Sequence, residues 1–140
     1  MRRLLAILFS LLALAAQAHA ADVPDADAKG TRAVIQAQLK AFAADDAKGA
    51  FAFATPQLRE LFGSPENFIA MVRRSYPVVY RPATVAFLKP ELDGDAVTQA
   101  VHLTDADGRL WLALYRLERQ PDLRWRISAC QVVEARGQVT

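Results

Sequence analysis

The chain has 140 residues, of which 53% are hydrophobic and 23% charged, a balance typical of a folded domain and not of a disordered chain. Its 17 basic and 15 acidic residues give a formal net charge of +2, which excludes the strongly basic surface that nucleic-acid binding needs. The single cysteine excludes an internal disulfide and any zinc site built from several cysteines. The length predicts one domain.

The first twenty residues are typical of a secretory signal peptide. Arg2 and Arg3 precede a mostly apolar stretch over 4–16, and Ala18 and Ala20 supply small residues where a signal peptidase reads them. The apolar stretch is shorter than the ~20 residues that a spanning helix needs, so we expect cleavage after Ala20 and no stable membrane anchor afterwards. The sequence therefore predicts a periplasmic or secreted protein.

The remaining chain is close to neutral, because cleavage removes two of the 17 basic residues and leaves all 15 acidic ones. Neither nucleic acid nor an anionic membrane surface is an expected partner.

The residues that follow the cleavage site predict a short leader and then helices. Residues 21–30 are small, acidic and proline-containing, which indicates a mobile leader. Thr31 has the character of an N-cap, and apolar residues at helical spacing predict a first helix over 32–44. Asp46 is placed to cap a second, short helix.

Two further helices are expected from a repeated pattern. Thr55 and Ser64 each place a capping hydroxyl directly before a proline, the residue favoured at the first helical position. The second of these helices should end at about Ser75, because the residue before Pro77 avoids the α region.

After Pro77 the apolar spacing changes from about four to two, which predicts strands. Four strands are expected, over 80–88, 97–103, 109–118 and 125–134. Asp93-Gly94 and Asp107-Gly108 are hairpin turn signals, so the strands should be antiparallel. The fold class is therefore α+β: N-terminal helices packed on a curved, cone-like, four-stranded antiparallel meander in a single domain over 31–134, with a C-terminal tail over 135–140.

Two strands carry further information about the core. The strand over 109–118 is apolar on both faces, so we expect it to be central and covered on both sides, either by a sheet curved round a helix or by a second copy in a homodimer. In the last strand, Trp125 and Ile127 alternate with Ser128 and Cys130, which predicts that Trp125 and Ile127 point into the core.

Several short motifs follow one another in a characteristic order over about 33–134. They are Asp46, Ala50-Phe51, Ala54-Thr55-Pro56, Phe62-Gly63, Phe68, Met71-Val72, Tyr76, Arg81-Pro82, Asp107-Gly108, Trp111, Tyr115, Trp125-Arg126-Ile127 and Cys130. This succession resembles the bacterial family of domain of unknown function 4864, which is in turn similar to the nuclear-transport-factor-like, cystatin-like folds. The resemblance implies helices in the concave side of a curved antiparallel sheet, and it implies no reaction or catalytic residue.

The residues that could carry chemistry are few. His102 is the one histidine after the signal peptide and shares a strand face with Thr98 and Ala100. Its nearest acidic neighbours, Asp105 and Asp107, belong to a turn, where aspartate is favoured for backbone reasons. Asp45 and Asp46 are explained in the same way, by a helix stop and a cap. Cys130 lacks a second cysteine and is expected to be a buried small hydrophobe. We therefore expect no catalytic residue, no cofactor and no metal.

Aromatic residues with a polar tip are better candidates for a ligand pocket. Tyrosine, tryptophan and histidine combine an apolar body with a hydrogen-bonding group, which suits the wall of a binding site. The candidates are Tyr76, Tyr80, His102, Trp111 and Tyr115. The alternative is ordinary core packing with each polar tip bonded locally.

Three functions fit these observations. The first is a secreted or periplasmic binding or accessory domain, non-catalytic, that takes a small apolar ligand or forms a homodimer. The second is a small cofactor-free enzyme of isomerase or dehydratase type that uses His102 with an aspartate and a tyrosine. The third is a purely structural module of the cell envelope.

The signal peptide leads to a direct prediction. Protein secreted by its native host should begin at Ala21 and be about 2 kDa lighter than the full chain, as measured by intact mass. Mature protein that retains Met1 would contradict it.

Overall fold

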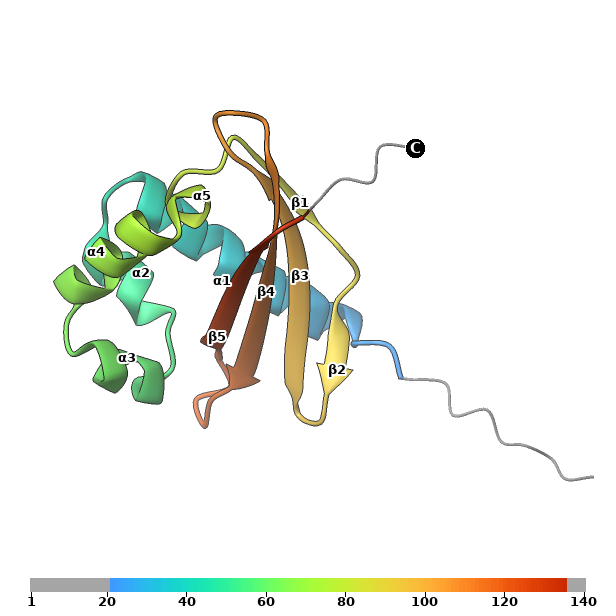
Figure 1. Ribbon diagram of the computed structural model, residues 1–140. Helices are drawn as coiled ribbons and strands as arrows, with labels where there is room; N and C mark the ends of the chain where they lie inside the picture. The colour runs from blue at the N-terminus through green and yellow to red at the C-terminus, as the bar shows by residue number, and fades with distance from the viewer. Residues whose placement is uncertain (1–20, 136–140) are drawn as a thin grey trace, which may run out of the picture.

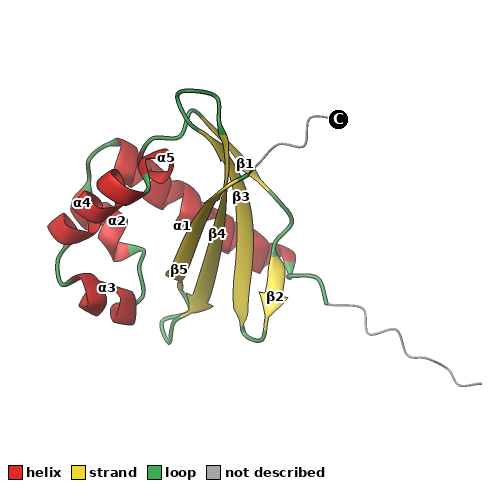
Figure 2. Ribbon diagram, viewed as in Figure 1, coloured by secondary structure: helices red, strands yellow, loops and turns green. Residues whose placement is uncertain are grey.

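The computed structural model describes residues 21–135, which form a layer of helices packed on one antiparallel sheet (Figures 1 and 2). The helices are α1 (Asp25–Ala43), α2 (Ala47–Ala52), α3 (Pro56–Phe62), α4 (Pro65–Ser75) and α5 (Pro77–Tyr80). The strands are β1 (Thr84–Phe87), β2 (Glu91–Asp93), β3 (Ala96–Thr104), β4 (Leu110–Arg119) and β5 (Trp125–Glu134). Over this range no helix is both long and apolar enough to cross a membrane.

The sheet is open and curved, with strand order β1-β3-β4-β5 and the short β2 paired to β3 as well. All of these pairings are antiparallel. Figure 1 shows α1 running across one face of the sheet, while α2 to α4 gather beyond β5. The α+β class, with helices first and a curved antiparallel sheet after them, is confirmed, but the sheet has five strands and not four.

The first helix begins earlier than the sequence pattern predicts. α1 starts at Asp25, so the expectation of a mobile leader over 21–30 is wrong for residues 25–30, and Val23 before them is also buried. Thr31 is not an N-cap: it lies fully buried inside the helix, where its hydroxyl donates a hydrogen bond to the Asp27 carbonyl at 2.9 Å. A threonine inside a helix can donate to a carbonyl of the preceding turn, so a threonine in the sequence does not by itself mark a helix start.

The starts of α2, α3 and α4 are as expected from their capping residues. Asp46, Thr55 and Ser64 each accept a hydrogen bond from the backbone N–H three residues later, at 2.9, 3.3 and 3.1 Å. In α3 and α4 a proline follows the cap and occupies the first turn. These bonds satisfy N–H groups that a helix leaves without partners at its start.

The segment predicted as a strand over 80–88 is divided in the structure. Residues Pro77–Tyr80 form the short helix α5, and strand pairing starts only at Thr84. Pro82 lies between the two elements, where its missing N–H costs no ladder hydrogen bond.

The core lies between α1 and the inner face of the sheet. β4 is central, since it pairs with both β3 and β5, and Ala113, Tyr115 and Leu117 on its inner face are buried. Trp125 and Ile127 at the start of β5 are 8% and 2% exposed, which confirms that both point into the core.

A β-bulge interrupts β5 just after these two residues. Leu117 pairs with Ile127, but Arg116 pairs with Ala129, so one extra residue is inserted opposite β4. Because successive strand residues point to opposite faces, the insertion reverses the alternation. Cys130 and Val132 therefore share the inner face with Ile127, although strict alternation from Trp125 predicts the opposite face.

The outer face of the sheet carries apolar residues that are partly accessible. Leu114 and Val133 are 41% and 49% exposed, and His102 lies on this face opposite Leu112 and Ala86. The homodimer expected from the two-sided apolar pattern of β4 stays a prediction.

Burial of Trp125 can be tested by truncation. Trp125→Ala should lower the free energy of unfolding by about 3–5 kcal/mol, because the indole fills the core beside Gly30. The control is Leu123→Ala, which removes a side chain that is 74% exposed and should change the free energy by less than about 0.5 kcal/mol. Denaturant melts would measure both, and similar losses in the two variants would contradict the assignment.

Candidate functional site

An apolar pocket lies between the helical layer and the inner face of the sheet, and we call it the inner pocket. Its volume is about 200 Å³. Every helix except α2 contributes to its wall, together with β4 and β5; the lining residues are Gln38, Phe42, Leu58, Phe62, Phe68, Met71, Val72, Tyr76, Val79, Tyr115, Ile127, Cys130 and Val132. Three of its phenylalanines pack as a cluster, with the Phe68 ring 5.6 Å from Phe42 and 5.2 Å from Phe62 between centroids. The wall contains neither a carboxylate nor a histidine.

Tyr115 is the unusual polar residue of this pocket. It lies mid-strand in β4 between Gln99 and Cys130 and is 1% exposed. Its hydroxyl is buried and makes no hydrogen bond to a nitrogen or oxygen atom among the described residues, and the polar group that it interacts with is the Cys130 sulfur, a weak acceptor. A buried polar group with only a weak partner lowers the stability of a fold, so such groups are rare.

The environment keeps the Tyr115 phenol protonated. Burial raises its pKa well above the usual value, and the neighbouring Cys130 thiol raises it further. A neutral phenol can donate one hydrogen bond and accept others.

Cys130 is also held in its neutral form. The residue is partly exposed by surface area, but its thiol faces the inner pocket, and the loss of solvation there raises its pKa to about 12. The sulfur and not the backbone titrates, so the surroundings of the thiol set this pKa. A thiol of this kind is a poor nucleophile at neutral pH.

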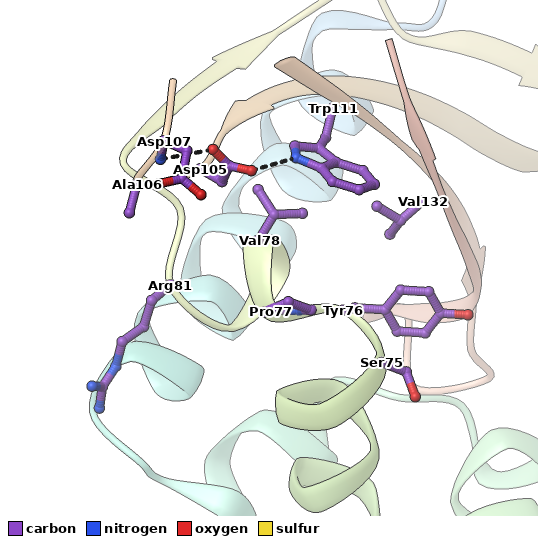
Figure 3. Close-up of a pocket in the computed structure, with 10 residues that line it drawn as sticks. All are labelled: Ser75, Tyr76, Pro77, Val78, Arg81, Asp105, Ala106, Asp107, Trp111 and Val132. Carbon is purple, nitrogen blue, oxygen red and sulfur yellow. Dashed lines mark hydrogen bonds between the residues drawn. The ribbon is translucent and has the colours of Figure 1, made fainter. Parts of the chain in front are cut away.

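A second pocket, which we call the outer pocket, adjoins the first. Its volume is about 330 Å³, and Tyr76 and Val132 line both pockets. Figure 3 shows the Tyr76 ring and the Trp111 indole on two sides of it, with Val78 and Val132 between them. The guanidinium of Arg81 extends away from the pocket in this view.

The proline that follows Tyr76 determines where its side chain lies. The proline keeps Tyr76 out of the helical region, so α4 ends at Ser75 and Tyr76 adopts φ −133° and ψ 58°. Its carbonyl accepts hydrogen bonds from the N–H groups of Val79 and Tyr80, which start α5. The Tyr76 ring is thereby held where the two pockets meet.

Asp105 holds the Trp111 indole at the wall of the outer pocket. One carboxylate oxygen accepts the Trp111 Nε1–H bond at 3.0 Å, and the other accepts the backbone N–H groups of Asp107 and Arg109. These bonds, the one from Trp111 first, hold the pKa of Asp105 below its usual value. The carboxylate is therefore already engaged in the hairpin turn and is a weak proton acceptor.

The structure brings together three of the five candidate pocket residues. Tyr76 lines both pockets, Trp111 the outer one and Tyr115 the inner one. Tyr80 lies outside both: its hydroxyl donates to Asp45, whose pKa this bond lowers, and Arg81 stacks on its ring at 4.8 Å. His102 lies on the outer face of the sheet and lines neither pocket.

Of the residues that line the inner pocket, sequence reasoning identified only Tyr76 and Tyr115 as pocket candidates, and three of the others show why the rest were missed. The strand face of Cys130 and Val132 was not predicted, because it depends on the bulge and no residue type near 128 indicates a bulge there. Gln38 resembles a solvent-facing helix residue, yet it is 4% exposed and its amide nitrogen donates to the Ala50 carbonyl at 3.1 Å. Its place on the apolar face of α1, between buried Ile35 and Phe42, is the signal that could have indicated its burial.

Over residues 21–135 no group of three or more histidine, cysteine or acidic side chains is arranged to hold a metal ion. The site is therefore best described by its apolar walls.

Comparison with solved structures defines the class of fold. The crystal structure of an NTF-2 like protein of unknown function from Silicibacter pomeroyi DSS-3 aligns with a TM-score of 0.56 at 16% identity, over 79% of this chain and 97% of that chain. The structure of "a putative dehydratase from the NTF2-like family" of Streptomyces avermitilis aligns with a TM-score of 0.54 at 13% identity, over 81% and 99% of the two chains. The fold is thus NTF2-like.

The family follows from the sequence itself. The model of the domain of unknown function DUF4864 matches residues 24–140, so the chain belongs to that family. The resemblance seen in the order of the motifs is confirmed. A comparison with curated proteins finds no match.

The raised pKa of Cys130 leads to a prediction about its reactivity. The rate at which iodoacetamide alkylates the folded protein should keep rising with pH through 9 and 10, because the thiol in the inner pocket ionises only near 12. In guanidinium the alkylation rate of the same cysteine should level off once the pH passes 9.0, the ordinary pKa of a cysteine thiol. A plateau below pH 9 in the folded protein would show that the thiol is solvated.

Proposed function

We propose that this protein is an exported, non-catalytic binding domain that takes a small, mainly apolar molecule between its helices and its sheet. The observation that supports this most strongly is the inner pocket itself, a hollow of about 200 Å³ whose wall holds no charged side chain. Ligand sites are typically apolar hollows with a few well-placed polar groups, and the inner pocket fits that description.

The chemistry of the pockets favours binding over catalysis. The wall of the inner pocket holds no carboxylate and no histidine, and its Tyr115 and Cys130 side chains both stay protonated near neutral pH. Asp105 at the outer pocket has a lowered pKa and is committed to Trp111 and the turn. His102, on which the isomerase or dehydratase hypothesis depends, lies on the opposite face of the sheet.

The structure named "putative dehydratase" supports the enzyme alternative only at the level of the fold, which hosts unrelated activities. A purely structural envelope module would need no pocket. Binding of a ligand therefore separates our proposal from that third hypothesis.

Export is the second part of the proposal. It is supported by the signal-like pattern over 1–20 and by the place of the expected cleavage site. Ala21 is exposed, whereas Val23 two residues later is already part of the core. Cleavage after Ala20 would thus leave the packed domain complete.

Val132 offers a direct test of the binding function. Ethylbenzene, an uncharged probe of suitable size, should bind to the wild type and shift the NMR signals of Val72 and Val79. Val132→Phe should weaken this binding by about tenfold or more, because the added ring occupies the space where the two pockets meet.

The neighbouring residue supplies a matched control. Val133→Phe makes the same chemical change on the outer face of the sheet and should leave the affinity unchanged. If ethylbenzene and acetophenone both fail to bind to the wild type, or if the two variants behave alike, the pocket is not a binding site.

A further inference from the structure

The outer pocket differs from the inner pocket in its charge. Its wall combines two aromatic side chains, Tyr76 and Trp111, with the carboxylates of Asp105 and Asp107, whereas the wall of the inner pocket holds no charged side chain. Figure 3 shows the two rings on two sides of the outer pocket and Asp105 beside the indole. A charged group of a ligand would therefore meet its partners in the outer pocket.

Asp105 carries a negative charge at the wall of this pocket. Its hydrogen bonds come from the Trp111 indole and from the backbone N–H groups of Asp107 and Arg109, and all of these donors are uncharged. They hold the pKa of the carboxyl below its usual value, so it stays ionised near neutral pH. The charge of the Arg109 side chain has the smallest effect on this pKa, and Arg109 does not line the pocket. The bonds therefore fix the direction of the carboxylate without cancelling its charge.

The arginine of the wall does not neutralise this charge. The guanidinium of Arg81 extends away from the pocket (Figure 3). It bonds to the Asp45 carboxylate at 3.0 Å and lies over the Tyr80 ring at 4.8 Å. Its charge is therefore paired outside the pocket, and the carboxylates of the wall are left for a positively charged ligand.

The aromatic rings of the wall favour a positive charge as well. The face of an aromatic ring attracts a cation that lies within about 6 Å of the ring centre, and an indole does so most strongly. The Trp111 N–H donates to the Asp105 carboxylate, which polarises the indole and makes its face more negative. Tyr76 and Trp111 are both partly exposed, so a ligand in the pocket can reach them.

These groups favour an organic cation over the other kinds of ligand. A calcium ion needs about six or more oxygen ligands, and no group of three or more acidic, histidine or cysteine side chains is arranged to hold a metal within residues 21–135. An anion would meet two carboxylates, and an uncharged molecule would remove water from Asp105 without replacing it by a counter-charge. An amine or a quaternary ammonium group suits both the carboxylates and the rings.

On the basis of the binding function proposed above, we propose that the ligand is an organic cation whose apolar body occupies the inner pocket. Its ammonium group lies in the outer pocket between Tyr76 and Trp111, beside Asp105. The outer pocket, at about 330 Å³, has room for a trimethylammonium group and part of the apolar body. Because Tyr76 and Val132 line both pockets, one molecule can occupy the two together.

The test compares phenyltrimethylammonium with tert-butylbenzene, two probes of the same shape that differ in a charged nitrogen and an uncharged carbon. Each is titrated by NMR into the wild type, Asp105→Asn and Trp111→Leu. The first variant removes the charge but keeps an oxygen that can accept the N–H bonds of the turn, and the second removes the ring. Each variant should weaken the binding of phenyltrimethylammonium by about fivefold relative to tert-butylbenzene.

Asp122→Asn is the matched control. Asp122 also accepts a backbone N–H from two residues later in a hairpin turn, that of Arg124 at 2.9 Å. It lies between β4 and β5, at the other end of the sheet, and lines neither pocket. Asp122→Asn should leave the ratio of the two affinities unchanged. If it changes the ratio as much as Asp105→Asn does, the effect is one of net charge and the inference is wrong.

The outcomes separate this inference from the binding function. If ethylbenzene and tert-butylbenzene bind but the ratio of affinities is the same in the wild type, Asp105→Asn and Trp111→Leu, the cation inference is wrong while the binding function stands. If no probe binds to the wild type, the binding function itself fails.

A second measurement uses the wild type alone and covers the case in which a variant does not fold. The chain has two tryptophans, Trp111 and Trp125, which lie at opposite ends of the ladder between β4 and β5. Phenyltrimethylammonium should shift the indole N–H signal of Trp111 and leave that of Trp125 in place. Its methyl protons should move upfield in the ring currents of Tyr76 and Trp111. Bound methyl protons without a nuclear Overhauser effect to either ring would overturn the inference.

Discussion

The chain between α2 and α3 is hydrogen-bonded to the edge of β5 at one residue, Ile127. The position of the helices that line the site depends on these bonds. The Ile127 N–H donates to the Phe53 carbonyl at 2.8 Å, and the Ile127 carbonyl accepts from the Thr55 N–H at 2.9 Å. These two bonds form a short parallel bridge between Ala54 and the sheet. They place α3 and α4 beyond the edge of the sheet, so that their apolar residues face the end of the core and not its middle.

The bulge that directly follows Ile127 completes this arrangement. By reversing the alternation of β5, it turns Cys130 and Val132 towards the helices and leaves Ala129 and Gln131 outside. The inner pocket is thus bounded by helices that Ile127 positions and by strand residues that the bulge redirects. Tyr115 lies opposite Cys130 at this point, and both residues contribute to the wall of the inner pocket.

The site has consequences for energetics as well as for recognition. A buried phenol whose polar neighbour is a thiol lowers stability, whereas phenylalanine at the same position would avoid that loss. The apolar wall of the inner pocket, with three phenylalanines, provides the surface on which the proposed ligand would bind.

Local chemistry in the sequence determined the elements: the Thr55 and Ser64 caps before proline, the two Asp-Gly turns and the core direction of Trp125 all follow from short-range rules and are confirmed. The start of α1 was predicted wrongly, because Thr31 is of a residue type that caps helices but lies buried inside this one. The sequence pattern did not determine which face of the sheet lines a pocket. An alternating pattern fits either face equally well until helices cover one of them. Only the tertiary structure placed His102 outside and Tyr115 inside, and only the inserted residue in β5 brought Cys130 and Val132 to the same side.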